Sequence, residues 1–416
     1  MNILSRSTTV GYISSVGLSI ILLMMLYASP MMVLLLILIY VYVVRGKRLD
    51  NWFAFLSALF IATVASLVNP NGEVIGDVVR YYNRYDYNSD YYMSLLEMKA
   101  YQYALFNIME YFGLPNRTYT FISIFLFTFN IISSILNITA GLNVEINGVK
   151  KNVLFIVLLF SFIPSSIYFS FEYLLALSFI VRGLSSILLK RYFPFLFWSL
   201  CGILIHNGTF YFIGIIILAH IIRKRNYTFA LLLSSVMPLA LFFLTSQAHV
   251  TGFDYLDLLF KKLYFYINGP WSRYETLADY DYFTYTFLRL LSFFLVLFIF
   301  IRYKVPHKGY TILVLVISVS SLFFPPSRTL FFRYVYFGTL FLIPAYAYII
   351  LKLKISQNVK YFFMLFILVS GFQYMNLSVY RLVSEHVEPL VLFGSIDKIA
   401  SYRLNVPLDN LGSERE

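Results

Sequence analysis

The stretch TLFFRYVYFGTLFLIPAYAYIIL occupies residues 329–351 and ends directly before Lys352 and Lys354. Its side chains are nearly all apolar, and a helix of this length covers the ~30 Å hydrocarbon core of a bilayer. Lysine-rich ends of apolar spans stay on the cytoplasmic side of a membrane. The stretch therefore predicts a transmembrane helix that starts on the outer side at Thr329 and reaches the cytoplasm at Lys352.

The same alternation of apolar runs and charged segments continues along the chain. Basic clusters follow or precede apolar runs at Arg45-Lys47-Arg48, Lys150-Lys151, Lys190-Arg191, Arg223-Lys224-Arg225, Arg302-Lys304-Lys308 and Lys352-Lys354-Lys360. Most of the 20 Asp and Glu residues fall in the segments of the opposite side. This is the positive-inside pattern of a polytopic membrane protein, and it predicts that any chemistry takes place on the outer face.

The composition supports the same interpretation. The chain is 60% hydrophobic and 12% charged, with a mean hydropathy of +0.76. A soluble protein of 416 residues cannot bury that much apolar surface in one core. The net charge of +12 would suggest nucleic acid as a partner, but the cytoplasmic clusters that carry it face anionic lipid, so we expect no nucleic-acid binding. Cys201 lies alone in an apolar run and is expected to pack there.

We predict an all-α, polytopic integral membrane protein with about 12 transmembrane helices in a single domain, residues 1–416. The even number puts both termini outside, and the first apolar run is too long for a cleavable signal peptide. Because residues 10–44 are almost continuously apolar, we prefer one first span, which ends at Arg45. The predicted spans are 20–44, 52–68, 117–138, 153–169, 172–190, 192–206, 208–222, 227–246, 283–301, 309–325, 329–351 and 360–376.

Two large periplasmic loops, 69–116 and 247–282, and a C-terminal tail, 377–416, lie on the outer side in this scheme. Each loop contains an amphipathic pattern that predicts a helix lying along the membrane surface. The first covers residues 94–112, with an apolar face of Leu95, Met98, Leu105, Ile108, Met109 and Phe112. The second has Leu256, Leu259, Phe260 and Leu263 at helical spacing.

Two membrane hairpins are unusually short. Each arm between Arg191 and Arg223 reaches only ~22 Å at 1.5 Å per residue, so its tip, His206-Asn207-Gly208, should lie below the outer surface. The arm 310–324, which ends at Pro325-Pro326-Ser327-Arg328, is equally short. Polar backbone at that depth must line protein or water. We therefore predict an outward-open depression with His206 and Arg328 near its wall.

Three arginines, Arg182, Arg289 and Arg333, fall inside predicted spans, where each costs ~2.5–3.5 kcal/mol on insertion scales. Arg289 and Arg333 lie close below the outer boundary, at the depth of Arg328. A guanidinium group binds phosphate oxygens bidentately and keeps its charge. Arg289, Arg328 and Arg333 are therefore candidates to hold a lipid-linked phosphate or pyrophosphate. Alternatively, the arginines reach toward the surface or pair with loop carboxylates, above all Arg182, which is deeper.

Candidate acids and bases are Asp77, Glu172 and His206. Any of them could take a proton from a sugar hydroxyl. Glu172 could instead complement a helix N-terminus or partner an arginine, and His206 could be structural.

The run Asp77-Val78-Val79-Arg80-Tyr81-Tyr82 places Asp77, Arg80 and Tyr81 on one helical face. In a functional reading, Arg80 or Arg84 contacts phosphate or sugar. The alternative is a solvated helix with a local ion pair worth less than ~1 kcal/mol.

Tyrosines crowd the outer loops together with Trp271. They suit an interfacial aromatic belt, and Tyr81 or Trp271 could also stack on sugar rings. We expect no metal: the five histidines are scattered, and Asp279-Tyr280-Asp281 is a weak signal. The chain has no nucleotide-binding loop and no Gly-x-Ser-x-Gly, so we expect no cofactor and an activated lipid-linked donor as the energy source.

The order of these features resembles the Wzy-type polysaccharide repeat-unit polymerases, in particular their EpsG-like branch. The resemblance covers roughly residues 50–350 and rests on four short motifs. These are Asp77-Val-Val-Arg-Tyr81-Tyr82 in the first outer loop, Glu97 before a surface helix and a span, Ile205-His206-Asn207-Gly208 at a hairpin tip, and Arg333-Tyr334 at the start of a late span. One departure is that such proteins often have Arg-Gln at the start of the fifth span, where this chain has Glu172-Tyr173.

The resemblance implies a metal-independent glycosyltransferase of the bacterial inner membrane. It would join undecaprenyl-pyrophosphate-linked oligosaccharide repeat units of O-antigen, capsule or exopolysaccharide at the periplasmic face, in a pathway that also uses a flippase and a chain-length regulator. Two alternatives remain from the sequence: a transferase or ligase that uses a polyprenyl-phosphate sugar, and a transporter of lipid-linked oligosaccharide. A transporter would place its charges at mid-depth, whereas most charges here lie in the outer third.

Overall fold

The computed structural model describes residues 51–66, 77–87, 99–146, 148–162, 171–222, 227–246, 277–305, 307–323 and 327–367, with a few single positions elsewhere. All regular elements in these ranges are helices, which confirms the all-α prediction for this part of the chain. By length and composition, two of them, Arg117–Gly141 and Leu330–Lys352, are able to cross a membrane. The predicted span 20–44, the second loop helix and the tail 377–416 lie largely or wholly outside the described residues.

Most of the described helices overlap apolar segments predicted from the sequence, although α8 and α14 begin four and six residues earlier than predicted. Their bounds are α3 Asn51–Ser66, α4 Asp77–Tyr87, α6 Ala100–Tyr111, α7 Arg117–Gly141, α8 Val149–Phe162, α9 Phe171–Leu188, α10 Tyr192–Ile205, α11 Phe210–Ile222, α12 Tyr227–Ser246, α14 Leu277–Arg302, α15 Lys308–Ser320 and α16 Arg328–Ala347. Short 3-10 turns cover Asn207–Thr209 (η2) and Ser321–Phe323 (η4), and a π-helical turn, Tyr348–Lys352, extends α16. A further helix begins at residue 357.

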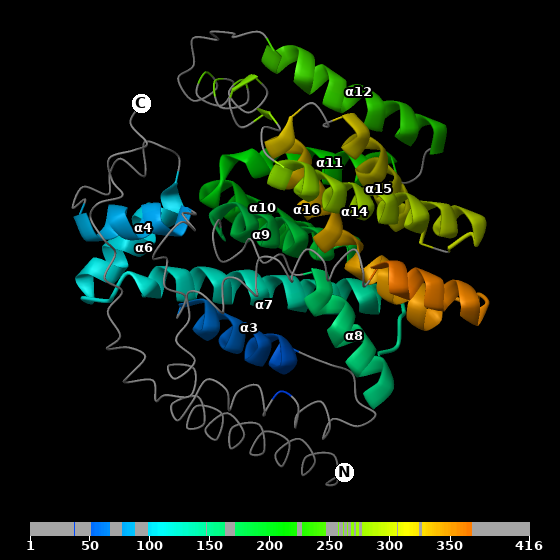
Figure 1. The fold of residues 1–416 in the computed structure, drawn as a ribbon, viewed down its shortest axis with the longest axis horizontal. Helices are drawn as coiled ribbons and strands as arrows, with labels where there is room; N and C mark the ends of the chain where they lie inside the picture. Colours follow the sequence, from blue (N-terminus) through cyan, green and yellow to red (C-terminus); the bar gives the residue numbers. More distant parts are fainter. Residues whose placement is uncertain are drawn as a thin grey trace.

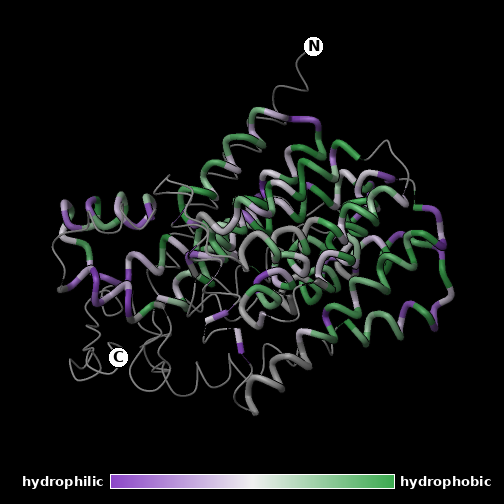
Figure 2. The backbone as a smooth tube through the Cα atoms, turned by 90° about the horizontal axis from the view of Figure 1, so that it is seen from above, coloured by the Kyte–Doolittle hydropathy of each residue, from purple (hydrophilic) through white to green (hydrophobic). Residues whose placement is uncertain are grey.

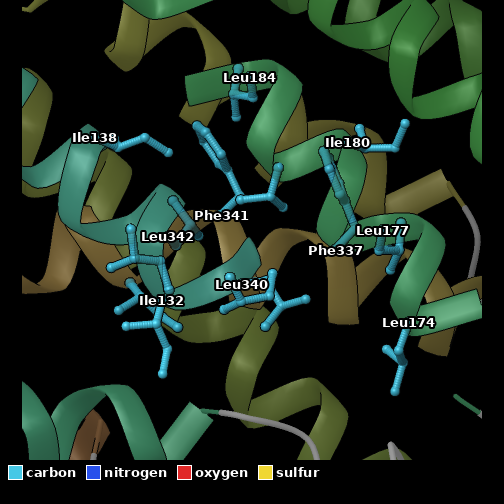
Figure 3. Packing of buried hydrophobic residues seen from close by; sticks show 14 of the residues in the cluster. Ile132, Ile138, Leu174, Leu177, Ile180, Leu184, Phe337, Leu340, Phe341 and Leu342 are labelled. Atoms are coloured by element: carbon cyan, nitrogen blue, oxygen red, sulfur yellow. The ribbon is translucent and has the colours of Figure 1, made fainter. Parts of the chain in front are cut away.

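The central layer is formed by α7, α9 and α16. α7 packs along α3 and α9, α9 packs on α10, and α16 contacts α7, α9 and α14. Figure 3 shows the apolar side chains at this junction: Ile132 and Ile138 come from α7, Leu174, Leu177, Ile180 and Leu184 from α9, and Phe337, Leu340, Phe341 and Leu342 from α16. The three helices therefore pack closely on one another, because much of their shared surface is apolar.

Two glycines allow helices to approach closely. A Cβ at Gly202 of α10 would lie 2.7 Å from Ile180 Cδ1 of α9. A Cβ at Gly338 of α16 would lie 2.5 Å from Phe293 Cε2 of α14. Since real Cβ atoms do not come so near, only glycine allows these helix pairs to pack as they do.

The surface helix α6 differs in part from its prediction. It begins at Ala100, and its buried side chains include Leu105, Phe106 and Met109. Ile108 and Phe112, which the pattern placed on the same apolar face, are 51% and 66% exposed. The reason is that Phe106, whose ring centroid lies 4.9 Å from that of Tyr119, turns the helix toward α7.

Polar and apolar surfaces are separated along the molecule. α4 and α6 lie at one end of α7, and residues 357–367 lie toward its other end (Figure 1). Figure 2 shows that hydrophobic residues predominate along most of the helices, with hydrophilic residues concentrated toward the ends of the molecule. The outer face of α10 carries exposed apolar side chains at helical spacing, namely Phe193, Leu196, Phe197, Leu200 and Leu204. A continuous exposed apolar stripe is unusual on a soluble protein.

Candidate functional site

Six side chains from five elements form a cluster at the end of the bundle where α4 and α6 lie. We call it the acid–base cluster; its members are Lys99, Tyr119, Glu172, Tyr173, His206 and Arg333. α7, α9 and α16 each begin here, and the break between α10 and α11 contributes His206. Three residues predicted from the sequence, Glu172, His206 and Arg333, are thereby brought together.

Glu172 is the acidic centre of this cluster. Its side chain is buried, with 3% of the residue exposed. The hydroxyl of Tyr119 donates a 2.6 Å hydrogen bond to Oε1, and the ammonium group of Lys99 lies 4.0 Å from Oε2. A buried carboxylate requires such compensation. A cation near Glu172 is thus Lys99, whereas the sequence had suggested an arginine as a possible partner.

Tyr173 connects the remaining members. Its hydroxyl donates a 3.0 Å hydrogen bond to the carbonyl of Arg333, and the Arg333 guanidinium lies 4.8 Å from the centre of its ring. The His206 ring meets Tyr173 edge to face at 5.3 Å. Stacking uses the face of a guanidinium, whereas phosphate is bound at its edge. Arg333 can therefore stack on Tyr173 with the face of its guanidinium and bind an anion with the edge at the same time.

The hairpin tip fixes the orientation of His206. α10 ends at Ile205, and the backbone N–H of Gly208 donates a 3.1 Å hydrogen bond to Nδ1 of His206. A neutral imidazole has one acceptor and one donor nitrogen. Because Nδ1 accepts, this bonding assigns the proton of the neutral ring to Nε2. His206 thus offers a hydrogen-bond donor to whatever faces Nε2.

α4 covers the cluster from outside the bundle. Tyr81 is 4% exposed, its ring lies 5.5 Å from that of Tyr119, and Lys99 Nζ lies 5.9 Å from its centre. Asp77 begins α4 one helical turn before Tyr81. Arg80 on the same helix is exposed. The predicted helical run 77–82 is present, with Tyr81 buried against the cluster.

Three contacts hold α4 in place. Tyr82 bonds with Thr120 of α7 at 2.6 Å, Arg84 donates to Gln102 of α6 at 3.0 Å, and Tyr85 donates to the carbonyl of Leu114 at 2.8 Å. Burial raises the pKa of Tyr82 to about 12, since a buried phenolate loses its hydration. Arg84, predicted to touch substrate, thus ties the two surface helices together.

Arg289 lies on α14, the helix that packs beside α16. α14 and α16 run parallel, because Phe293 meets Gly338 and, further along, Phe300 meets Tyr348. One turn back from the first contact are Arg289 on α14 and Tyr334 on α16. Arg289 is 2% exposed and is also within electrostatic range of Tyr346. Ser292, three residues after Arg289, bonds with Tyr346 at 2.6 Å, so this part of α14 faces α16 well beyond Arg333.

The other two predicted binding residues are less fully described. Arg328 is the first residue of α16, and the preceding Ser327 accepts a 3.4 Å hydrogen bond from the backbone N–H of Leu330. Trp271 lies outside the described residues.

Arg182, the deepest of the three predicted buried arginines, is held by contacts within the helix bundle. It donates a 2.5 Å hydrogen bond to Oδ1 of Asn130, and its guanidinium lies 4.3 Å from the centre of Trp198 and 5.4 Å from that of Phe129. Desolvation of this arginine is offset by an amide and two aromatic faces. The sequence reading had paired it with the surface or a loop carboxylate.

Three members of the cluster were missed by sequence reasoning: Lys99, Tyr119 and Tyr173. Their only signal is that Lys99 stands alone in an outer loop otherwise rich in acids and tyrosines, and that Tyr173 follows Glu172. Within the described residues, no three His, Cys, Asp or Glu side chains are grouped to hold a metal ion.

Comparison with protein-family models, with curated proteins and with solved structures finds no match for this chain.

Proposed function

We propose that the chain is a polytopic inner-membrane glycosyltransferase that joins undecaprenyl-pyrophosphate-linked oligosaccharide repeat units at the periplasmic face. The observation that carries the proposal is the meeting of His206 and Arg333 at the ring of Tyr173, the residue that follows the buried Glu172. An acid, a hydrogen-bond donor and a guanidinium at one end of an apolar bundle are the groups that glycosyl transfer from a lipid pyrophosphate requires.

Membrane placement is supported by the exposed apolar side chains of the peripheral helices. Phe193 is 81% exposed, Phe243 on α12 67% and Phe298 on α14 65%. Lipid is the environment in which such surfaces are stable. In this proposal about 12 spans cross the bilayer, and the acid–base cluster is on the side opposite the basic loops.

The donor would be held through its phosphates. In our mechanism the edge of Arg333 and the Nε2–H of His206 contact the pyrophosphate, with Arg289, Arg328 and Arg80 contributing positive charge around it. As the bond between the anomeric carbon and the phosphate oxygen breaks, the leaving pyrophosphate gains negative charge, which these donors stabilise.

The acceptor hydroxyl must lose its proton as it attacks the anomeric carbon. His206 is a poor base in this orientation, because Nδ1 already accepts a hydrogen bond and Nε2 carries the proton. Two candidates therefore remain: Glu172, which is in the cluster, and Asp77, which begins the helix that covers it. The proton passes to one of these carboxylates, and undecaprenyl pyrophosphate leaves.

The experiment that tests the proposal is a gel of surface polysaccharide from cells in which the gene is deleted and then restored. Collapse of the ladder to a single repeat unit, with recovery on complementation, supports polymerisation. An intact ladder with altered mobility would instead indicate a transferase that adds one sugar. Loss of every repeat, with lipid-linked units accumulating inside the cell, would indicate a transporter.

A further inference from the structure

A cavity of about 220 Å³ lies at the other end of the bundle. It is bordered by the C-terminal turns of α7, α9 and α11 and by the start of α15. No member of the acid–base cluster lines it. Tyr119 in the cluster and Ile138 in the cavity wall are both on α7, ~28 Å apart at 1.5 Å per residue. The cavity is therefore a separate site.

The wall of the cavity is mostly apolar. Ile138, Leu184, Ile216 and Leu313 are among its lining residues, and its polar groups include Ser185, His220 and His307. A volume of 220 Å³ equals that of about seven water molecules at ~30 Å³ each. Pockets for drug-sized ligands measure roughly 300–1,000 Å³. The space is therefore large enough for part of one flexible apolar chain and too small for a whole nucleotide or oligosaccharide.

Positive charge surrounds the cavity. Lys352 donates a 3.1 Å hydrogen bond to the carbonyl of Leu142, which lines the wall. Lys190 follows the lining residue Leu189, and Lys308 stands between the lining residues His307 and Gly309. The lining itself contains no carboxylate. The nearest acid along α7 and its following turn is Glu145, which is exposed.

We propose that this cavity binds one acyl chain of an anionic phospholipid, with the lipid phosphate at Lys352 and Lys190. The apolar wall accepts the chain, and the lysines favour a negatively charged headgroup over a zwitterionic one. Under the positive-inside rule this end faces the cytoplasmic leaflet, which carries anionic lipid. The inference rests on the proposed membrane placement and is independent of the polymerase activity.

Photo-crosslinking of the full chain in vesicles tests this directly. Two probes are compared in otherwise identical phosphatidylcholine vesicles: phosphatidylglycerol and phosphatidylcholine, each with a diazirine at the end of one acyl chain. We expect phosphatidylglycerol to label peptides with residues 138–142 and 184–189 more strongly. Equal labelling by the two probes, or labelling confined to the exposed stripe of α10, would overturn the proposal.

A cavity-filling variant adds a second measurement. A Cβ at Gly141 would meet Leu189 Cδ2 at 3.8 Å, so a side chain there fits and extends toward the cavity. We expect Gly141→Leu to reduce labelling by phosphatidylglycerol about tenfold, because it displaces part of the acyl chain. Gly214→Leu is the matched control, since nothing lies within 4 Å of a Cβ there. Undiminished labelling of folded Gly141→Leu would contradict the assignment.

The lysines are tested separately. Lys352→Gln and Lys190→Gln should each bring labelling by the two lipids closer to equal, whereas Lys360→Gln should not. If Gly141→Leu fails to fold, this comparison and the wild-type labelling map still decide the question. An unchanged preference for phosphatidylglycerol in both lysine variants would exclude the phosphate contact. Because no enzymatic turnover is measured, an inactive polymerase would not affect the result.

Discussion

The hydroxyl of Tyr119 donates a 2.6 Å hydrogen bond to Oε1 of Glu172, a residue 53 positions away. This bond joins α7 to α9 at the end of the bundle where α4 and α6 lie. It also fixes the carboxylate next to Lys99, whose ammonium group lies 4.0 Å from Oε2. The orientation of Glu172 therefore depends on a phenol that the sequence offers no reason to single out.

Replacing Tyr119 with Phe tests that dependence. The change removes the hydroxyl and keeps the ring contacts with Tyr81 and Phe106. We expect the free energy of unfolding to fall by ~1.5–3 kcal/mol, the usual range for a hydrogen bond to a charged group. We also expect the rate of polymer formation to fall. Thermal unfolding in detergent measures the first effect. Ser123→Ala, which removes a partner of the neighbouring Tyr101, is the control; an equal drop in both variants would argue against a special role for Glu172.

Arg333 is predicted to bind phosphate through the edge of its guanidinium. Arg333→Ala should lower the rate of polymer formation ~100- to 1,000-fold, as the loss of one transition-state donor does. Arg333→Lys should recover little of it, because an ammonium cannot bind bidentately. Transfer by purified protein with a lipid-pyrophosphate donor is the measurement. Arg302→Lys, at the exposed end of α14, serves as the control, and wild-type rates in both Arg333 variants would remove the phosphate role.

Glu172→Gln and Asp77→Asn separate the two candidate bases. Both changes are close to isosteric, so the variant that lacks the base should lose ~100- to 10,000-fold in rate. The other should remain within about tenfold of the wild type. His206→Gln should weaken binding of the lipid-pyrophosphate substrate and leave the pH dependence of the rate nearly unchanged. The reason is that Nε2–H serves as a hydrogen-bond donor and not as the base. A wild-type rate for both carboxylate variants would show that neither residue is the base.

Gly338→Ala should destabilise the bundle. The new Cβ would lie 2.5 Å from Phe293 Cε2 and 3.0 Å from Ile317 Cγ2, so the buried ring of Phe293, or the helix that carries it, has to move. Overpacking of this kind costs ~1–3 kcal/mol, which should lower the unfolding temperature. Gly214→Ala, where nothing lies within 4 Å, should leave stability unchanged or slightly raised. Equal unfolding temperatures for the two variants would show that the α14–α16 contact is looser than the structure indicates.

His307 predicts a dependence of stability on pH. Partial burial, followed by the charge of Lys352, lowers its pKa below 6.5, while a hydrogen bond to the Leu142 carbonyl acts in the opposite direction. The unfolded chain then binds more protons than the folded one just below pH 6.5, so stability falls as the pH decreases through this range. His307→Gln should flatten that part of the curve of unfolding temperature against pH. An identical slope in the variant would contradict the lowered pKa.

Much of the fold could be read from the sequence. The bounds of α7, α9, α10, α12 and α16 fall within a few residues of the predicted spans, because apolar run length and basic flanks are local properties. The break at His206 also followed from the length of its hairpin. The orientation of α6 did not, since its apolar residues surround much of the helix. Contacts with distant segments, such as Phe106 with Tyr119 and Arg84 with Gln102, decide which face is buried.

The candidate site could be predicted only as separate residues. By itself the sequence determined apolar runs of helical length between basic clusters, and a small set of unusual charges that included Glu172, His206 and Arg333. Tertiary structure decided that Tyr173 brings His206 and Arg333 together, that Lys99 is the cation near Glu172, and that Arg182 rests on Trp198. The physical reason is that hydropathy and charge set the depth of each residue in a helix. Helix rotation and neighbour choice depend on side-chain packing between segments that are far apart in the chain.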